Sequence, residues 1–235
     1  MKNIKISIIG NSVALRNRPV LNHPDNINYC KHIEIELEKK DSRNYQVVNL
    51  SDGGITIVEV INDIDKFVST FPDYFIINLG AVDAPNREIP HWLNKIINNK
   101  LDGFFRNGLK YIHAKFIKPN RSFFVKLRGK RGWVSEKRFT YLFRTLLEYL
   151  VKETNAKVIV LGINPTTDRV EKQLPGTKEK YKKFSNIMNT ITNNLNQKYI
   201  NLDDLNPEIH CPDGVHFSSE GHKEVSLRIV KIIQN

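Results

Sequence analysis

The sequence predicts an α/β fold of three layers, α/β/α, in which helices cover both faces of a central five-stranded parallel sheet. Five short apolar runs, rich in β-branched residues, alternate with longer segments that have helical periodicity. Glycines end the first, third and fourth runs and follow the second within a few residues. Loops at the carboxyl ends of parallel strands meet at one edge of the sheet, so a site is expected at this edge.

The expected strands are short apolar segments bounded by turn residues. Such runs are typical of strands that are buried on both faces. The strands are expected at residues 4–9, 45–50, 74–79, 157–162 and 199–202.

The expected helices show apolar residues at intervals of three and four. Ser135 and Ser218 are suited to cap two of them, since serine accepts from free N–H groups of a first turn. The helices are expected at residues 29–40, 57–71, 91–100, about 109–116, 135–153, 181–196 and 219–233. The regular alternation is interrupted at about residues 84–133. We therefore expect a single domain over residues 1–235 that carries a basic helical insertion after the third strand.

The positive charge of the chain is concentrated in and just after this insertion. The whole sequence carries a net charge of +11, and residues 106–138 hold eleven Lys and Arg against one Glu. Aromatic residues are interleaved with them, and many are expected to pack a small core within the insertion. Such a segment is consistent with a solvated face, an anionic glycan or nucleotide-linked sugar, single-stranded nucleic acid, or an acidic membrane surface. Of these partners, nucleic acid is the least favoured.

Several classes of protein do not fit the sequence. It has no apolar run of about 18–20 residues, so no transmembrane segment is expected, and no signal peptide is recognised. Cys30 and Cys211 are expected to be reduced thiols of a cytoplasmic protein. Neither dinucleotide-binding nor P-loop glycine motifs occur, so no cofactor is expected. The spacing of His210, Cys211, His216 and His222 matches no standard zinc pattern, and no metal is expected. His222 is expected to pack or to act as a cap at the start of the last helix.

Chemically useful residues follow the first and last expected strands. Asp213 and His216 lie three residues apart in a loop, where the carboxylate can hold one ring nitrogen of the imidazole. The other ring nitrogen could then take a proton from Ser12, which follows the first strand. Taken alone, the Asp213–His216 pair equally fits an ordinary surface turn.

Four motifs in order along the chain strengthen the catalytic interpretation. They are Gly10-Asn11-Ser12, residues 51–56, residues 80–83 and residues 213–222. In this order and on these elements they resemble the sequence blocks of the SGNH, or GDSL-like, hydrolase family. The resemblance spans residues 6–222. It implies a flavodoxin-like fold and ester hydrolysis through an acyl-serine intermediate, with no metal or organic cofactor.

The resemblance also implies a role for each matching residue. Ser12 would be the nucleophile, His216 the general base and then acid, and Asp213 its orienting partner. The backbone N–H groups of Ser12 and Gly54 would bind the oxyanion. The family has an asparagine as a third donor, and Val82 stands in its place. Losing one such donor typically costs about 10²–10³ in rate.

Three explanations of Val82 stay open. Asn11, Asn86 or Arg87 could supply the missing donor, the site could work with two donors, or it could have kept binding and lost hydrolysis. Asp83, beside Val82, could be a structural loop residue that caps the following turn.

The resemblance and the charge together favour a substrate class. We expect a serine esterase that removes a small acyl group, an O-acetyl group in the first instance, from a carbohydrate. Lys126 and Arg128 are expected to contact an anionic part of the substrate. The alternatives are a weakened or inactive module that binds an anionic glycan, and an acyltransferase that shares the first half of the reaction.

Overall fold

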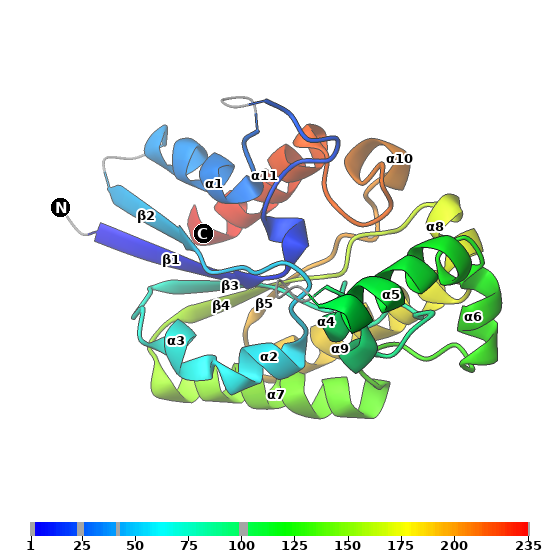
Figure 1. The fold of residues 1–235 in the computed structure, drawn as a ribbon. Helices are drawn as coiled ribbons and strands as arrows, with labels where there is room; N and C mark the ends of the chain where they lie inside the picture. Colours follow the sequence, from blue (N-terminus) through cyan, green and yellow to red (C-terminus); the bar gives the residue numbers. More distant parts are fainter. Residues whose placement is uncertain (1–2, 23–25, 41–42, 99–102, 235) are drawn as a thin grey trace.

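The computed structural model describes residues 3–22, 26–40, 43–98 and 103–234. Figure 1 shows three layers, with the sheet lying between two groups of helices. This arrangement confirms the α/β/α architecture predicted from the sequence. Within the described residues no helix is long and apolar enough to span a membrane.

The sheet has five parallel strands in the order β2-β1-β3-β4-β5. β1 lies between β2 and β3, with Ile8 paired to Asn49 on one side and to Ile76 on the other. Its four central apolar positions are buried, as expected of a strand covered on both faces. The strand bounds are β1 (Asn3–Gly10), β2 (Asn44–Asn49), β3 (Tyr74–Asn78), β4 (Lys157–Leu161) and β5 (Lys198–Ile200).

Helices cover both faces of the sheet (Figure 1). Each turns an apolar stripe inward, and Phe139, Phe143 and Phe184 stack together on the second face. The first face carries α1 (Tyr29–Glu38) and α11 (Ser219–Gln234); the second carries α2 (Ile57–Asn62), α3 (Ile64–Val68), α7 (Glu136–Glu153) and α9 (Thr177–Asn194). Ser135 and Ser218 accept from N–H groups of the first turns of α7 and α11, as predicted.

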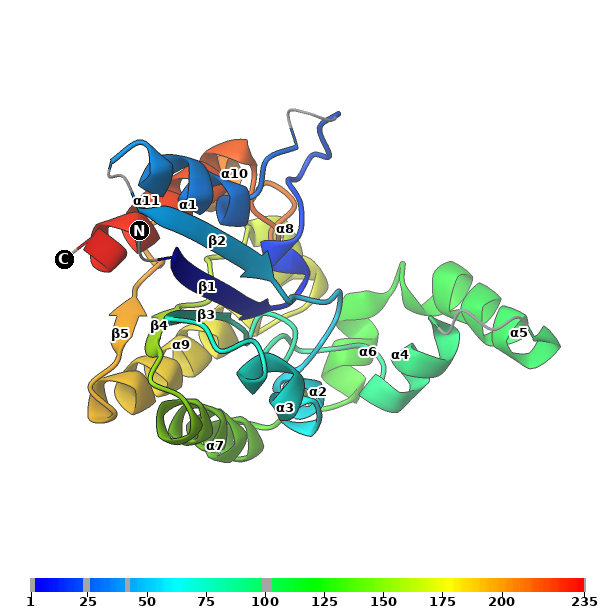
Figure 2. The ribbon, with the colours of Figure 1, turned by 90° about the vertical axis from the view of Figure 1, so that its left-hand side faces the viewer.

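The insertion follows β3 and projects away from the sheet beyond the carboxyl ends of the strands (Figure 2). Lys95 ties it to the body through a 2.6 Å ion pair with Glu59 of α2. The Trp133 indole donates to the carbonyl of Ile89 at its base. It contains α4 (His91–Ile97), α5 (Phe104–Ile112), a π-helical stretch (His113–Ile117) and α6 (Arg121–Leu127).

Several expected elements differ from the structure. The helix expected at 57–71 is two helices, because Asp63 leaves helical geometry between them. The loop expected after β4 contains α8 (Asp168–Gln173), and a further short helix, α10 (Pro207–His210), precedes the last loop. The last residues of the helix expected at 91–100 lie outside the described residues.

The aromatic residues of the insertion correct another expectation. Phe104, Phe105 and Phe123 are exposed, and so are Tyr111 and Phe116. They do not form a small internal core, although Trp133 does pack between His91 and Arg87. The sequence pattern was misleading because aromatic residues of short helices form a core only where another element covers them.

His222 joins the two helices of the first layer. It is fully buried, and its Nδ1 accepts from the backbone N–H of Tyr29 at 3.1 Å. Burial lowers its pKa to about 3. The imidazole is therefore neutral and acts as a packing group and helix cap, in agreement with the sequence interpretation.

This buried imidazole makes the fold sensitive to acid. Between about pH 6.5 and pH 3 the unfolded chain binds a proton at His222 and the folded chain does not, so the free energy of unfolding falls as the pH falls. We expect His222→Asn, which keeps an acceptor for Tyr29, to lose less stability over this range. Urea unfolding of both proteins at pH 7, 6, 5 and 4 measures the difference, and parallel curves would contradict the assignment.

Candidate active site

Ser12 lies in the turn directly after β1. Gly10 ends the strand, and Ser12–Ala14 form a single 3₁₀ turn capped by Asn11, whose Oδ1 accepts from the N–H of Val13 at 3.0 Å. Asn11 is fully buried, whereas Ser12 is partly exposed. The turn therefore presents the hydroxyl at the surface above a fixed backbone.

Asp213 and His216 lie in the loop between α10 and α11. The Asp213 carboxylate Oδ2 is 2.7 Å from His216 Nδ1, and its Oδ1 accepts from the backbone N–H groups of Val215 and His216. On the other side of the ring, His216 Nε2 is 2.9 Å from the Ser12 hydroxyl. The three predicted residues therefore form a continuous chain of contacts, from Asp213 through His216 to Ser12.

The electrostatics of Asp213 favour its ionised form. Partial burial opposes the charge, but the hydrogen bonds from His216 and the backbone outweigh it and hold the carboxyl pKa below its usual range. Arg18 lies 3.9 Å from the same carboxylate, and Arg169 donates to the Asp213 carbonyl. Arg18 lies in an irregular segment and Arg169 in the short helix α8 (Asp168–Gln173), and neither belongs to one of the four motifs, so they were not predicted from the sequence.

Main-chain hydrogen bonds bring the loops of the site together. The Asp52 N–H donates to the Gly10 carbonyl at 3.1 Å, which holds the second motif against the first. Asn11 donates to the Asn78 carbonyl, which places the turn beside the end of β3. Arg18 donates to the Phe217 carbonyl at 2.8 Å and joins the first loop to the last. The four motifs therefore meet at one edge of the sheet.

Two backbone donors at this edge stay available. Gly54 adopts φ +76°, a conformation that favours glycine, and a Cβ there would meet no atom within 4 Å. Within the described part of the chain, the N–H groups of Ser12 and Gly54 have no acceptor. Both groups can therefore donate to an oxygen of a ligand.

The third motif is apolar where the family has a donor. Val82 is buried, so its side chain adds no hydrogen bond to this edge. Its neighbour Asp83 is fully buried, and its Oδ1 accepts from the Ile57 N–H at the start of α2 at 2.8 Å. Asp83 therefore caps α2, the helix that follows the second motif. The expectation from the sequence was a cap on the turn that directly follows it in the chain.

The other predicted binding residues are used in different ways. Asn86 is buried and donates to the Pro175 carbonyl at 2.7 Å. Arg87 lies over the Trp133 ring at 4.3 Å, and burial lowers its pKa. Arg128 donates to the Arg87 carbonyl, whereas Lys126 is exposed on α6. Contacts of these residues with a substrate stay predictions, as does a contact made by the buried Asn11.

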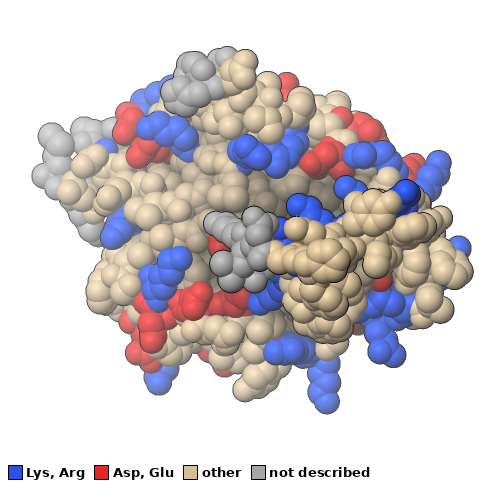
Figure 3. Space-filling model, viewed as in Figure 1, with Lys and Arg blue, Asp and Glu red and all other residues tan. Residues whose placement is uncertain are grey.

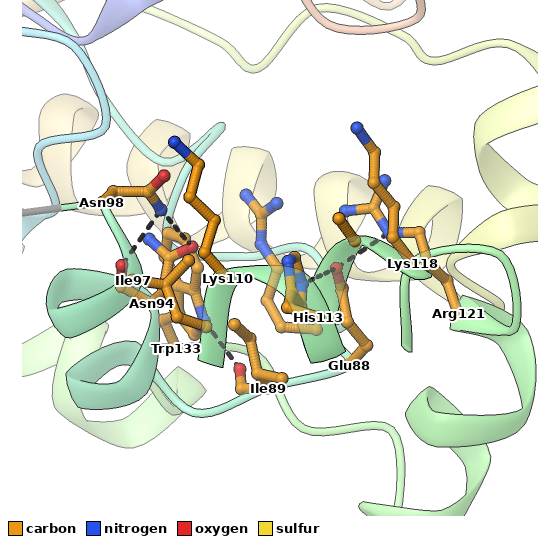
Figure 4. Close-up of a pocket in the computed structure, with 12 residues that line it drawn as sticks. Glu88, Ile89, Asn94, Ile97, Asn98, Lys110, His113, Lys118, Arg121 and Trp133 are labelled. Carbon is orange, nitrogen blue, oxygen red and sulfur yellow. Dashed lines mark hydrogen bonds and ion pairs between the residues drawn. The ribbon is translucent and has the colours of Figure 1, made fainter. Parts of the chain in front are cut away.

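A cavity of about 390 Å³ lies inside the insertion (Figure 4). Its floor holds Glu88, which is 95% buried and pairs with Arg121 at 2.9 Å and His113 at 3.4 Å. Lys110 and Lys118 rise on the same side of the cavity in Figure 4. Cationic side chains therefore outnumber the one carboxylate of this cavity.

No group of three or more His, Cys, Asp and Glu residues that could hold a metal ion occurs in the described parts of the chain. Cys211 is buried with its Sγ 3.2 Å from the Asn164 amide, and Cys30 is buried on the inner side of α1. Burial raises the pKa of Cys211 to about 12.

Two solved structures resemble the whole chain. A lipase/acylhydrolase from Enterococcus faecalis has a TM-score of 0.65 at 15% sequence identity, over 98% of this chain and 95% of that chain. An acetylxylan esterase from Geobacillus stearothermophilus has a TM-score of 0.62 at 14% identity, over 97% and 93% of the two chains. The chain has the fold of an SGNH hydrolase. No family model and no curated protein is similar to it at the level of sequence.

This likeness establishes the fold, as the four motifs predicted. Because the matches extend over nearly the full length of both chains, the insertion does not change the overall architecture of the SGNH-hydrolase fold. At identities near 15% the likeness shows the fold alone, and the substrates of the two enzymes are not thereby substrates of this chain.

Asp83 makes the free energy of unfolding depend on pH. Burial raises its pKa from 3.8 to about 7, despite the N–H groups of Ile57 and Gly80. Between about pH 4 and pH 7 the unfolded chain releases this proton and the folded chain keeps it. The free energy of unfolding therefore falls as the pH rises, and the two pKa values correspond to about 4 kcal/mol at most.

We expect Asp83→Asn, which keeps the acceptor for Ile57, to remove this dependence. The free energy of unfolding of the variant minus that of the native chain should increase from pH 4 to pH 7.5, as measured by urea unfolding. A difference that stays constant with pH would show that the Asp83 carboxyl is ionised in the folded protein throughout.

Proposed function

We propose that this chain is a serine ester hydrolase that removes a small acyl group, in the first instance O-acetyl, from a carbohydrate. The observation that carries the proposal is the chain of contacts from Asp213 through His216 Nδ1 and Nε2 to the Ser12 hydroxyl. The order and spacing of these groups fit nucleophilic acyl transfer.

In this mechanism His216 takes the proton of Ser12 while the serine oxygen attacks the ester carbonyl. Asp213 holds the ring in the tautomer that leaves Nε2 free and stabilises the imidazolium that forms. His216 then protonates the departing alcohol, and the ester C–O bond breaks to leave an acyl-Ser12 intermediate. A water molecule, deprotonated by His216, releases the carboxylic acid and restores Ser12.

The negative charge that develops on the carbonyl oxygen needs donors in the transition state. The free N–H groups of Ser12 and Gly54 are assigned this role. Val82 gives no third donor. Such a site would stabilise the tetrahedral intermediate less than one with an asparagine there, so we expect a modest kcat.

The choice of substrate rests on fold likeness and charge. One of the similar structures is an acetylxylan esterase, which supports an acetylated carbohydrate. The cations that line the cavity of the insertion favour a glycan or sugar phosphate with negative charge. Lys126 and Arg128, on and just after α6, are the residues assigned to such a group.

Val82 favours a second candidate function. A chain that lost this donor could keep the fold and its pocket and bind an anionic glycan without hydrolysing it. An acyltransferase is a further alternative, because transfer to a sugar and transfer to water share the acyl-enzyme. Quantifying released acetate in the presence of an acceptor sugar separates these outcomes.

Ser12→Ala tests the proposed mechanism. The variant lacks the nucleophile, so we expect kcat/KM for p-nitrophenyl acetate to fall by about 10³-fold or more. Ser69→Ala, which changes an exposed serine remote from the site, should keep full activity. A fluorophosphonate probe should label the native chain and fail to label Ser12→Ala.

Two results would overturn the mechanism. One is an active native chain whose ester cleavage survives Ser12→Ala. The other is a native chain that the probe does not label and that cleaves neither p-nitrophenyl acetate nor acetylated xylo-oligosaccharides, while it still binds an anionic glycan. The second result would support the binding module.

Val82→Asn tests the incomplete oxyanion site. An added amide donor should act mainly in the transition state and raise kcat for p-nitrophenyl acetate by about 10-fold or more, with little change in KM. Val82→Leu, of similar size and without a donor, controls for packing. If Val82→Asn is no faster than Val82→Leu, position 82 does not face the oxyanion.

A further inference from the structure

The side of α5 and of the π-helical stretch after it that faces the rest of the insertion is mixed in character. Its partly buried residues are Arg106, Leu109, His113 and Ile117. Lys110 and His113 line the cavity of the insertion (Figure 4), and His113 pairs with the buried Glu88.

The opposite side of the same segment is apolar and exposed. Phe104 is 98% exposed, Phe105 74%, Phe116 54% and Ile112 49%. With 100° between successive residues of α5, Phe105 and Ile112 fall on one side and Lys110 on the other. Phe116, in the π-helical stretch that continues α5, is exposed as well. Among the described residues no element covers these apolar side chains.

Other helices of the insertion also expose apolar side chains. Trp92 of α4, the helix that contacts α5, is 64% exposed, and Phe123 and Leu127 of α6 are exposed as well. Figure 3 shows an area free of charge over α4 and α5, with Lys and Arg around it. Exposed apolar surface of this kind, rimmed by polar groups, is uncommon in a monomeric soluble protein and marks an interaction site.

The positive charge around this apolar surface indicates what kind of partner it binds. Residues 106–138 carry a net charge of +10, so a second copy of the chain would bring two strongly positive segments together. Single-stranded nucleic acid would use aromatic rings for stacking, but the aliphatic side chains of Ile112 and Leu127 give no such contact. A surface that offers both anionic groups and an apolar interior satisfies the aromatic, aliphatic and basic residues together.

We propose that the apolar face of α5, together with the basic side chains around it, binds the surface of a membrane rich in anionic lipid. Phe104, Phe105, Ile112 and Phe116 enter the boundary between headgroups and acyl chains. Lys115, which is exposed on the same segment and does not line the cavity, contacts a lipid phosphate. The insertion projects from the edge of the sheet that carries Ser12 (Figure 2), so the site is held beside the membrane.

Vesicle flotation with the full chain tests the proposal. We expect binding to vesicles of phosphatidylcholine with about 30% phosphatidylglycerol, little binding to phosphatidylcholine alone, and weaker binding as salt increases. The double variant Phe104→Ser/Phe105→Ser should weaken binding by about 10-fold or more. Lys115→Gln should weaken it and reduce its dependence on salt.

Matched control variants distinguish binding through this surface from nonspecific hydrophobic adsorption and from an effect of net charge. Tyr141→Ser removes an exposed aromatic side chain from α7, and Lys223→Gln/Lys231→Gln removes two charges from α11. Both controls should bind vesicles like the native chain. All variants should keep the native urea midpoint and the hydrolysis of p-nitrophenyl acetate in solution, since the surface is separate from Ser12, His216 and Asp213.

Three results would overturn the proposal. The native chain could fail to bind anionic vesicles, or the phenylalanine variant could bind them as the native chain does. Alternatively, the chain could form dimers, or bind single-stranded DNA, through Phe104 and Phe105 without binding vesicles. The last result would assign the surface to the other partner. None of these outcomes bears on ester hydrolysis, which the Ser12→Ala variant tests independently.

Discussion

The site depends on the main-chain hydrogen bonds at the end of β1. Gly10 accepts from Asp52, and Asn11 donates to Asn78, so the loops after β2 and β3 are fixed to the turn that carries Ser12. These bonds are continuous with the parallel ladders on both sides of β1. The position of the serine is thus set by the sheet, which is the most rigid part of the fold. The Arg18 N–H, which donates to the Phe217 carbonyl, joins the loop of Asp213 and His216 to the same turn. Asn164 and Thr166 donate to carbonyls of that loop.

On the second face of the sheet, polar side chains likewise hold separate segments together. Asp83 joins the third motif to α2, and Glu59 at the start of that helix pairs with Lys95 of the insertion. Gly132 lets the returning chain pass close to this point, since a Cβ there would lie 2.9 Å from the Asp83 carbonyl. The insertion is therefore anchored to residues that also position the active-site edge.

The sequence predicted the sheet, its flanking helices and the Asp213–His216 contact because these depend on local patterns. The contact of Ser12 with His216, 204 residues away, was expected because both follow parallel strands and match motifs of one family. β-branched runs, glycine turns and a short Asp-to-His spacing leave few alternatives. The roles of Asn86, Arg87 and Arg128 could not be predicted in the same way. Their partners, Pro175, Trp133 and a backbone carbonyl, are set by tertiary packing. The orientation of α5 was also beyond prediction, because helical periodicity gives an apolar side without telling which side faces the protein.

The orientation of α5 affects how the protein behaves outside its proposed setting. In most chains, apolar surface becomes available for aggregation only after unfolding, so a more stable core improves solubility. Here Phe104 and its neighbours are exposed in the native state. Tighter packing of the α/β/α body would leave this source of aggregation unchanged. Solubility and stability are therefore separate properties of this protein, and changes to α5 can alter the first without altering the second.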